Sequence, residues 1–138
     1  MNRTIESRFD GYMDIEIIRR RVVVRPEPVS DLETFHPSIG AQLLAERLME
    51  IYIPNEFSLN FIHEMIGLAY LHNLKVFSSE AGYAARIFTP PEVEVSPICL
   101  TGLAGVGKSQ TIAALWRALP PPVAFTCDLY QGTVELIS

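Results

Sequence analysis

The sequence predicts an α/β fold in which a helical N-terminal extension precedes the first βαβ unit of a parallel sheet. Apolar residues recur at helical spacing between residues 39 and 69, prolines cluster over 89–97, and an apolar stretch followed by a glycine-rich loop begins at residue 97. We therefore expect an extended arm over 1–35, a helical region over 36–88, a linker over 89–96 and the start of an α/β domain over 97–138.

The composition is that of a globular chain. Its 138 residues fall within the range of a single domain, and 49% are hydrophobic while 20% are charged. The net charge of −5 carries no global signal for nucleic-acid binding. The N-terminus lacks an apolar signal-peptide core, and the uncharged run 95–107 is shorter than the ~20 residues of a membrane span. We expect a cytoplasmic chain with no membrane partner, with Cys99 and Cys127 as small buried residues.

The secondary structure of the N-terminal half is predicted from the positions of prolines and from the spacing of apolar residues. In "IEIIRRRVVVRPEP" the β-branched run 22–24 predicts a short strand or extended arm, and its arginines favour a solvated strand edge over a DNA contact. A helix is expected from near Ser38 to before Pro54, and a second from about Ser58. A short third helix is expected over 78–88. The apolar stripe of the first helix consists of Ile39, Leu43, Leu44, Leu48 and Ile51.

The C-terminal third predicts the βαβ unit. "ICLT" (98–101) is a short apolar run, "SQTIAALWRAL" (109–119) is a good helix former that Pro120 ends, and "VAFTCDLY" (123–130) is a second strand candidate. Trp116 is expected in the core of this unit.

The loop "GLAGVGKS" fits the pattern G-x-x-x-x-G-K-[ST], which is typical of a phosphate-binding P-loop. Glycines let the backbone turn so that successive N–H groups point inward around a phosphate, and the following helix adds its N-terminal N–H groups and dipole. Lys108 is expected to reach the β- and γ-phosphates of ATP, and the Ser109 hydroxyl to ligate Mg²⁺. Thr111 offers a further contact. The expected nucleotide-binding residues are Gly102, Leu103, Ala104, Gly105, Val106, Gly107, Lys108, Ser109 and Gln110.

With "GAQLLAERLMEIYIP" and "PICLTGLAGVGKSQTIAALWRALPPPV" together, the chain resembles the N-terminal half of the AAA+ ATPase regulators of heteromeric transposons, the TnsC type. The resemblance covers most of residues 36–138 and implies a P-loop NTPase sheet over 97–138. It implies ATP and Mg²⁺ as cofactors. It also implies DNA and transposase proteins as partners, and self-assembly into a ring or filament.

The chain departs from that family after the loop. A Walker B carboxylate, a sensor residue and an arginine finger are not recognisable, and Asp128, the one acidic candidate, is better placed to end a strand. We therefore expect an incomplete sheet, an N-terminal portion of a longer ATPase and inefficient hydrolysis, with no catalytic residue assigned. Two alternatives stay open: a P-loop signalling ATPase with a helical interaction arm, and a truncated, non-catalytic nucleotide-binding adaptor.

Overall fold

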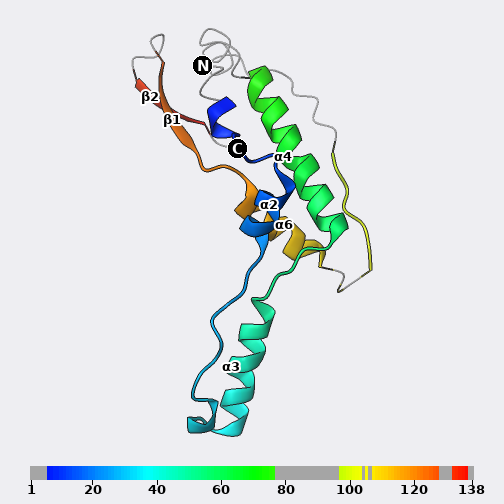
Figure 1. Ribbon diagram of the computed structural model, residues 1–138, viewed down its shortest axis with the longest axis vertical. Helices are drawn as coiled ribbons and strands as arrows, with labels where there is room; N and C mark the ends of the chain where they lie inside the picture. Colours follow the sequence, from blue (N-terminus) through cyan, green and yellow to red (C-terminus); the bar gives the residue numbers. More distant parts are fainter. Residues whose placement is uncertain (1–5, 77–96, 104, 106, 128–131, 137–138) are drawn as a thin grey trace.

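The computed structural model describes residues 6–76, 97–103, 105, 107–127 and 132–136, and this part of the chain is mostly helical (Figure 1). Three helices pack against one another in the middle of the molecule, while a fourth helix, α3, stands away from them. In chain order the elements are α2 (Ile15–Val22), the 3-10 turn η1 (Leu32–Thr34), α3 (Pro37–Met49), α4 (Glu56–Val76), α6 (Lys108–Ala118), β1 (Val123–Cys127) and β2 (Gly132–Leu136).

The predicted α/β fold is wrong, because the described residues contain no parallel sheet and no βαβ unit. Residues 98–101, the expected first strand, have no regular structure, and Ile98 and Cys99 are exposed. The second expected strand does form, as β1, but it pairs antiparallel with β2, so that Val123 lies opposite Leu136. A strand needs a partner for its backbone N–H and C=O groups. Here β1 finds that partner in the segment that follows it rather than in the segment before the loop.

The run 22–24, predicted as a short strand or extended arm, is helical in its first residue: Val22 ends the helix α2, and the backbone of Val23 is extended. Asp14 caps the helix, its carboxylate accepting hydrogen bonds of 2.8 and 3.1 Å from two backbone N–H groups of the first turn. The cap and the burial of Ile18 and Val22 on one face outweigh the strand preference of the β-branched residues. Strand-like pairing is confined to one bridge, in which Val24 and Tyr52 exchange backbone hydrogen bonds of 3.0 and 3.1 Å.

The predicted helix near Ser38 is present as α3, but it does not pack into the core. It begins at Pro37, a favoured first position, and Gly40 is its one buried residue among those described. A Cβ at Gly40 would lie 3.4 Å from the backbone oxygen of Leu32, so glycine lets η1 approach closely. Most of the apolar stripe expected to be buried is instead exposed: Ile39, Leu44, Leu48 and Ile51.

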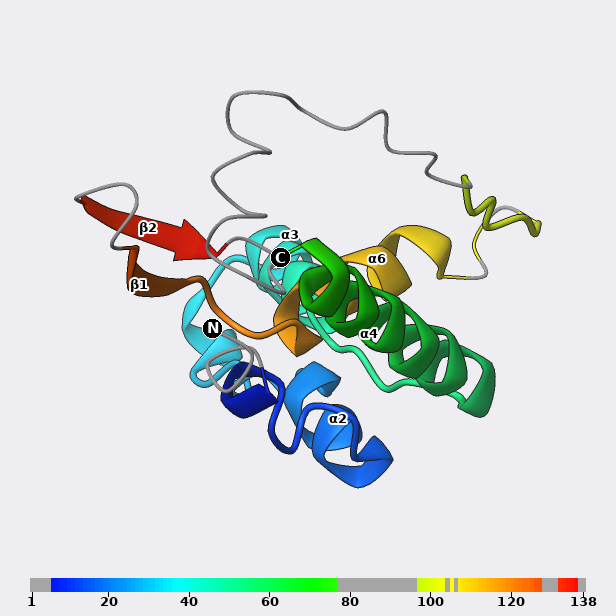
Figure 2. The same ribbon diagram turned by 90° about the horizontal axis from the view of Figure 1, so that it is seen from above.

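The core lies between α2, α4 and α6. The predicted second helix is present as α4, and Leu59, Ile62 and Ile66 on one of its faces are fully buried. Small residues at Ala114 and Ala118 let α6 approach this face, and Figure 2 shows the C-terminal half of α6 next to α2 and α4. The buried core consists of Phe9, Ile18, Val22, Tyr52, Leu59, Ile62, Ile66, Ala114 and Ala118.

Arg8 ties the N-terminal segment to two distant parts of the chain. Its Nη1 donates to Oδ1 of Asn73 at 3.0 Å, and its Nε donates to the backbone oxygen of Pro121 at 3.2 Å. Burial lowers the pKa of the Arg8 guanidinium from its usual value. The contacts hold the end of α4 next to the segment that leads into β1.

The expected third helix over 78–88 and the linker over 89–96 lie outside the described residues. Within the described ranges, none of the helices has the length and apolar character that crossing a membrane requires.

Replacing Ile62 by alanine should lower the free energy of unfolding by about 2–5 kcal/mol, because the substitution leaves a cavity among α2, α4 and α6. Leu68→Ala, on the exposed side of the same helix, should cost less than about 1 kcal/mol. Urea denaturation followed by circular dichroism measures both values. Equal losses for the two variants would contradict the position of the core.

Candidate phosphate-binding site

The glycine-rich loop leads directly into the N-terminus of α6. Gly105 and Gly107 have φ angles of +81° and +86°, a region that glycine enters without strain. A Cβ at either position would meet nothing within 4 Å, so glycine is needed for its backbone angle and not for space. The first helical hydrogen bond joins the N–H of Thr111 to the oxygen of Gly107 at 2.9 Å. The N–H groups of Lys108, Ser109 and Gln110 precede it and are open to an acceptor from outside the helix.

Lys108 bridges the loop. Its ammonium Nζ donates to the backbone oxygen of Gly102 at 2.8 Å and to that of Leu103 at 2.7 Å. These two bonds join the start of the loop to the first turn of α6. Ala104 and Val106, between the two ends, lie outside the described residues.

A hollow of about 400 Å³ opens at this helix end, lined by Gly105, Gly107, Lys108, Ser109 and Gln110. Its lining combines a primary ammonium, a hydroxyl and the N-terminal backbone of a helix, which together suit an anion. The Ser109 side chain is exposed, so its hydroxyl is accessible from solvent.

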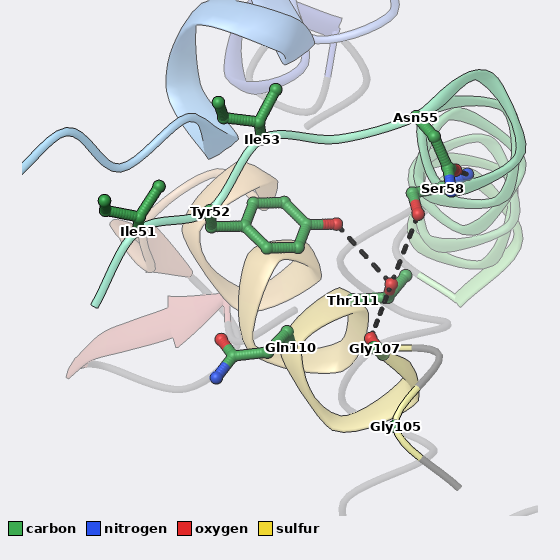
Figure 3. Close-up of a pocket in the computed structure, with 9 residues that line it drawn as sticks. All are labelled: Ile51, Tyr52, Ile53, Asn55, Ser58, Gly105, Gly107, Gln110 and Thr111. Atoms are coloured by element: carbon green, nitrogen blue, oxygen red, sulfur yellow. Dashed lines mark hydrogen bonds between the residues drawn. The ribbon is translucent and has the colours of Figure 1, made fainter. Parts of the chain in front are cut away.

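A second hollow, of about 270 Å³, adjoins the first and shares Gly105, Gly107 and Gln110 with it (Figure 3). Its other wall comes from the segment between α3 and α4, where Ile51 and Ile53 flank the buried Tyr52. A third hollow of about 200 Å³ lies against Lys108 and Thr111 from the side of Leu100 and Phe57. Among the described residues, neither Asp nor Glu lines any of the three.

The buried hydroxyl of Thr111 joins α6 to both neighbouring segments. It donates to the oxygen of Gly107 at 3.0 Å, and it lies 3.3 Å from the Ser58 hydroxyl and 3.5 Å from the Tyr52 hydroxyl (Figure 3). Because the Thr111 proton goes to Gly107, the other two hydroxyls can donate to the Thr111 oxygen. The first turn of α6 is therefore held from α4 and from the segment before it.

The structure brings five of the residues that the sequence singles out around one hollow: Gly105, Gly107, Lys108, Ser109 and Gln110. Gly102 and Leu103 contribute the backbone oxygens that hold Lys108, and Asp128 lies outside the described residues. Sequence reasoning missed the parts that Tyr52 and Ser58 play. The burial of Ser58 could have been noticed in the sequence, since Ser58 is a polar residue on the same helical face as Ile62. No group of three or more His, Cys, Asp or Glu side chains in the described stretches could hold a metal ion.

Replacing Thr111 by valine should lower the free energy of unfolding by about 1–3 kcal/mol, because the Tyr52 and Ser58 hydroxyls lose the oxygen they face in a buried place. The control is Thr101→Val at an exposed position, with an expected change within about 0.5 kcal/mol. Urea titrations measure the free energy of unfolding of the two variants. A stable Thr111→Val protein would mean that the three hydroxyls do not hold α6 in place.

Comparison with known proteins identifies no relative: no family model, no curated protein and no solved structure matches this chain. The resemblance to the transposition regulators therefore stays a prediction from the sequence.

Proposed function

We propose that this chain binds ATP with Mg²⁺ at the loop and helix start formed by residues 102–110. The observation that carries the proposal is the position of Lys108, whose ammonium is bonded across the loop and which lines a hollow of about 400 Å³ at the N-terminus of α6. A lysine, positive-φ glycines and free helix N–H groups are the parts that P-loops use to bind phosphates.

The triphosphate occupies the hollow at the N-terminal end of α6. Its oxygens accept from the N–H groups of Lys108, Ser109 and Gln110, and the Lys108 ammonium exchanges a backbone oxygen for a phosphate oxygen. This exchange costs little, since the ammonium has three donors and keeps a bond to the loop. The exposed Ser109 hydroxyl would be a side-chain ligand of Mg²⁺, which would neutralise part of the phosphate charge when bound.

The adjoining hollow receives the base. Ile51 and Ile53 give it apolar walls, and Asn55 and Gln110 give it amide groups. Oδ1 of Asn55 already accepts from the N–H of Ser58 at 2.8 Å, so its Nδ2 is the part of the amide that is left for a ring nitrogen of the base.

The resemblance supports a second step of the proposal, in which the ATP-bound chain assembles on DNA as a ring or filament and regulates a transposase. That step depends on the loop sequence and on the leucine-rich helix before it. The exposed leucines of α3 are available for contacts between subunits.

Lys108→Ala should weaken binding of a fluorescent ATP analogue by at least about tenfold, because a charge-assisted hydrogen bond to phosphate is lost. The matched control is Lys75→Ala, which changes the other lysine of the chain, on the exposed surface near the end of α4, and should leave affinity within about twofold. Fluorescence anisotropy measures the binding. Equal affinities for the two variants would reject the site.

The same variants address the second step. ATP-dependent co-sedimentation with duplex DNA should be lost in Lys108→Ala and kept in Lys75→Ala. ATP binding without any co-sedimentation would retain the nucleotide site and reject assembly on DNA.

A further inference from the structure

At the end of α6 opposite to the glycine-rich loop, a hollow of about 510 Å³ lies where Arg117 of α6 is bonded to Val22, the last residue of α2. It is separate from the ATP site, since the two have no lining residue in common. Its lining residues are Tyr12, Arg21, Trp116, Arg117, Leu119, Pro120, Pro121 and Pro122.

A guanidinium group with a buried donor lies in this hollow. The Arg21 guanidinium carbon is 3.6 Å from the centroid of the Tyr12 ring, a stacked cation–π contact that fixes the plane of the group. Nη1 of Arg21 is buried, and none of the described residues accepts a hydrogen bond from it. A buried donor without an acceptor is unfavourable, so a ligand that draws the edge of the Arg21 guanidinium into the hollow and accepts from it would relieve that cost.

The remaining walls are mostly apolar, and Pro121 and Pro122 are exposed. Trp116 is 68% exposed although it is a large aromatic residue, and the sequence had placed it in the core. Three successive prolines, 120–122, form a wall with few backbone donors and little freedom to move. Such walls suit an apolar side chain next to the group that Arg21 binds.

The charges around the hollow favour a ligand with a single negative charge over a ligand with several. Its two cations are Arg21 and Arg117, and Nη2 of Arg117 already donates to the backbone oxygen of Val22 at 3.0 Å. Both helices reach the hollow with their C-terminal ends, which carry partial negative charge. That negative charge repels a phosphate dianion about twice as strongly as a carboxylate, which carries a single charge and can accept two parallel hydrogen bonds in the plane of the Arg21 guanidinium.

We propose that this hollow binds an acidic side chain, Asp or Glu flanked by apolar residues, from a peptide segment of a protein partner. The carboxylate accepts from Arg21, and the flanking apolar side chain packs on Trp116 and the proline wall.

Trp116 is the only tryptophan of the chain, so its fluorescence and its indole N–H resonance report on this hollow alone. The probes are two mixtures of acetylated, amidated pentapeptides without Trp or Tyr: one has a central Asp or Glu between Leu, Ile, Val and Phe, and the other has Asn or Gln at the centre. The acidic mixture should change the Trp116 signals saturably, with an affinity at least about tenfold above that of the amide mixture.

Variants of Arg21 test whether this residue causes the preference for the acidic mixture. Arg21→Gln should remove the preference for the acidic mixture, and Arg21→Lys, which keeps the charge without the planar donor edge, should reduce it several-fold. The control is Arg25→Gln, which changes an exposed arginine outside the hollow and should keep the full preference. The acid–amide comparison in the unaltered chain needs no variant, so the test holds even if an Arg21 variant fails to fold.

Three results would overturn the proposal. The first is that neither mixture changes the Trp116 signals saturably. The second is that the acidic and amide mixtures bind equally. The third is that inorganic phosphate or a single-stranded oligonucleotide binds this hollow more tightly than the acidic mixture does.

Discussion

The position of α6 is the constraint on which both proposed sites depend. Its buried face is made of small residues, Ala114 and Ala118, which pack on the fully buried side chains of α2 and α4. One turn earlier the Thr111 hydroxyl joins this helix to Ser58 and Tyr52. The start of the helix is thereby fixed next to the glycine-rich loop, and its end is fixed next to Arg21. A change that loosened α6 would disturb the ATP site and the arginine hollow together.

The helices were predictable where the signal is local. The spacing of apolar residues indicates α3 and α4, and the run from Lys108 to Ala118, free of proline and glycine, indicates α6. The helix α2 was missed because its three arginines and β-branched residues resemble an exposed strand. Its formation depends on the Asp14 cap and on burial of Ile18, and the second of these appears only in the tertiary structure.

The sheet could not be predicted from its strands one at a time. An apolar run such as 98–101 becomes a strand only if another strand lies beside it, and the sequence does not state which segment that is. The same limit explains Trp116 and the leucines of α3, which have the composition of a core face but no helix packed over them among the described residues. Composition identifies what can be buried, and only the arrangement of the helices decides what is.

The candidate ATP site likewise has one part that the sequence predicts and one part that it does not. That Gly105, Gly107, Lys108 and Ser109 lie around one hollow was predictable because the loop is local in sequence, and the bonds from Lys108 to Gly102 and Leu103 span only a few residues. The wall formed by Ile51, Tyr52 and Ser58 was not predictable, because it comes from residues about fifty positions earlier in the chain.

Backbone amide chemical shifts during titration with ATP and Mg²⁺ test the central claim most directly. We predict saturable shifts of the amides of Gly105, Gly107, Lys108, Ser109 and Gln110, with smaller shifts at Ile51 and Ile53 and none on α3. The account would be contradicted if the amide resonances of the loop and of the first turn of α6 did not shift, whether ATP bound elsewhere or did not bind.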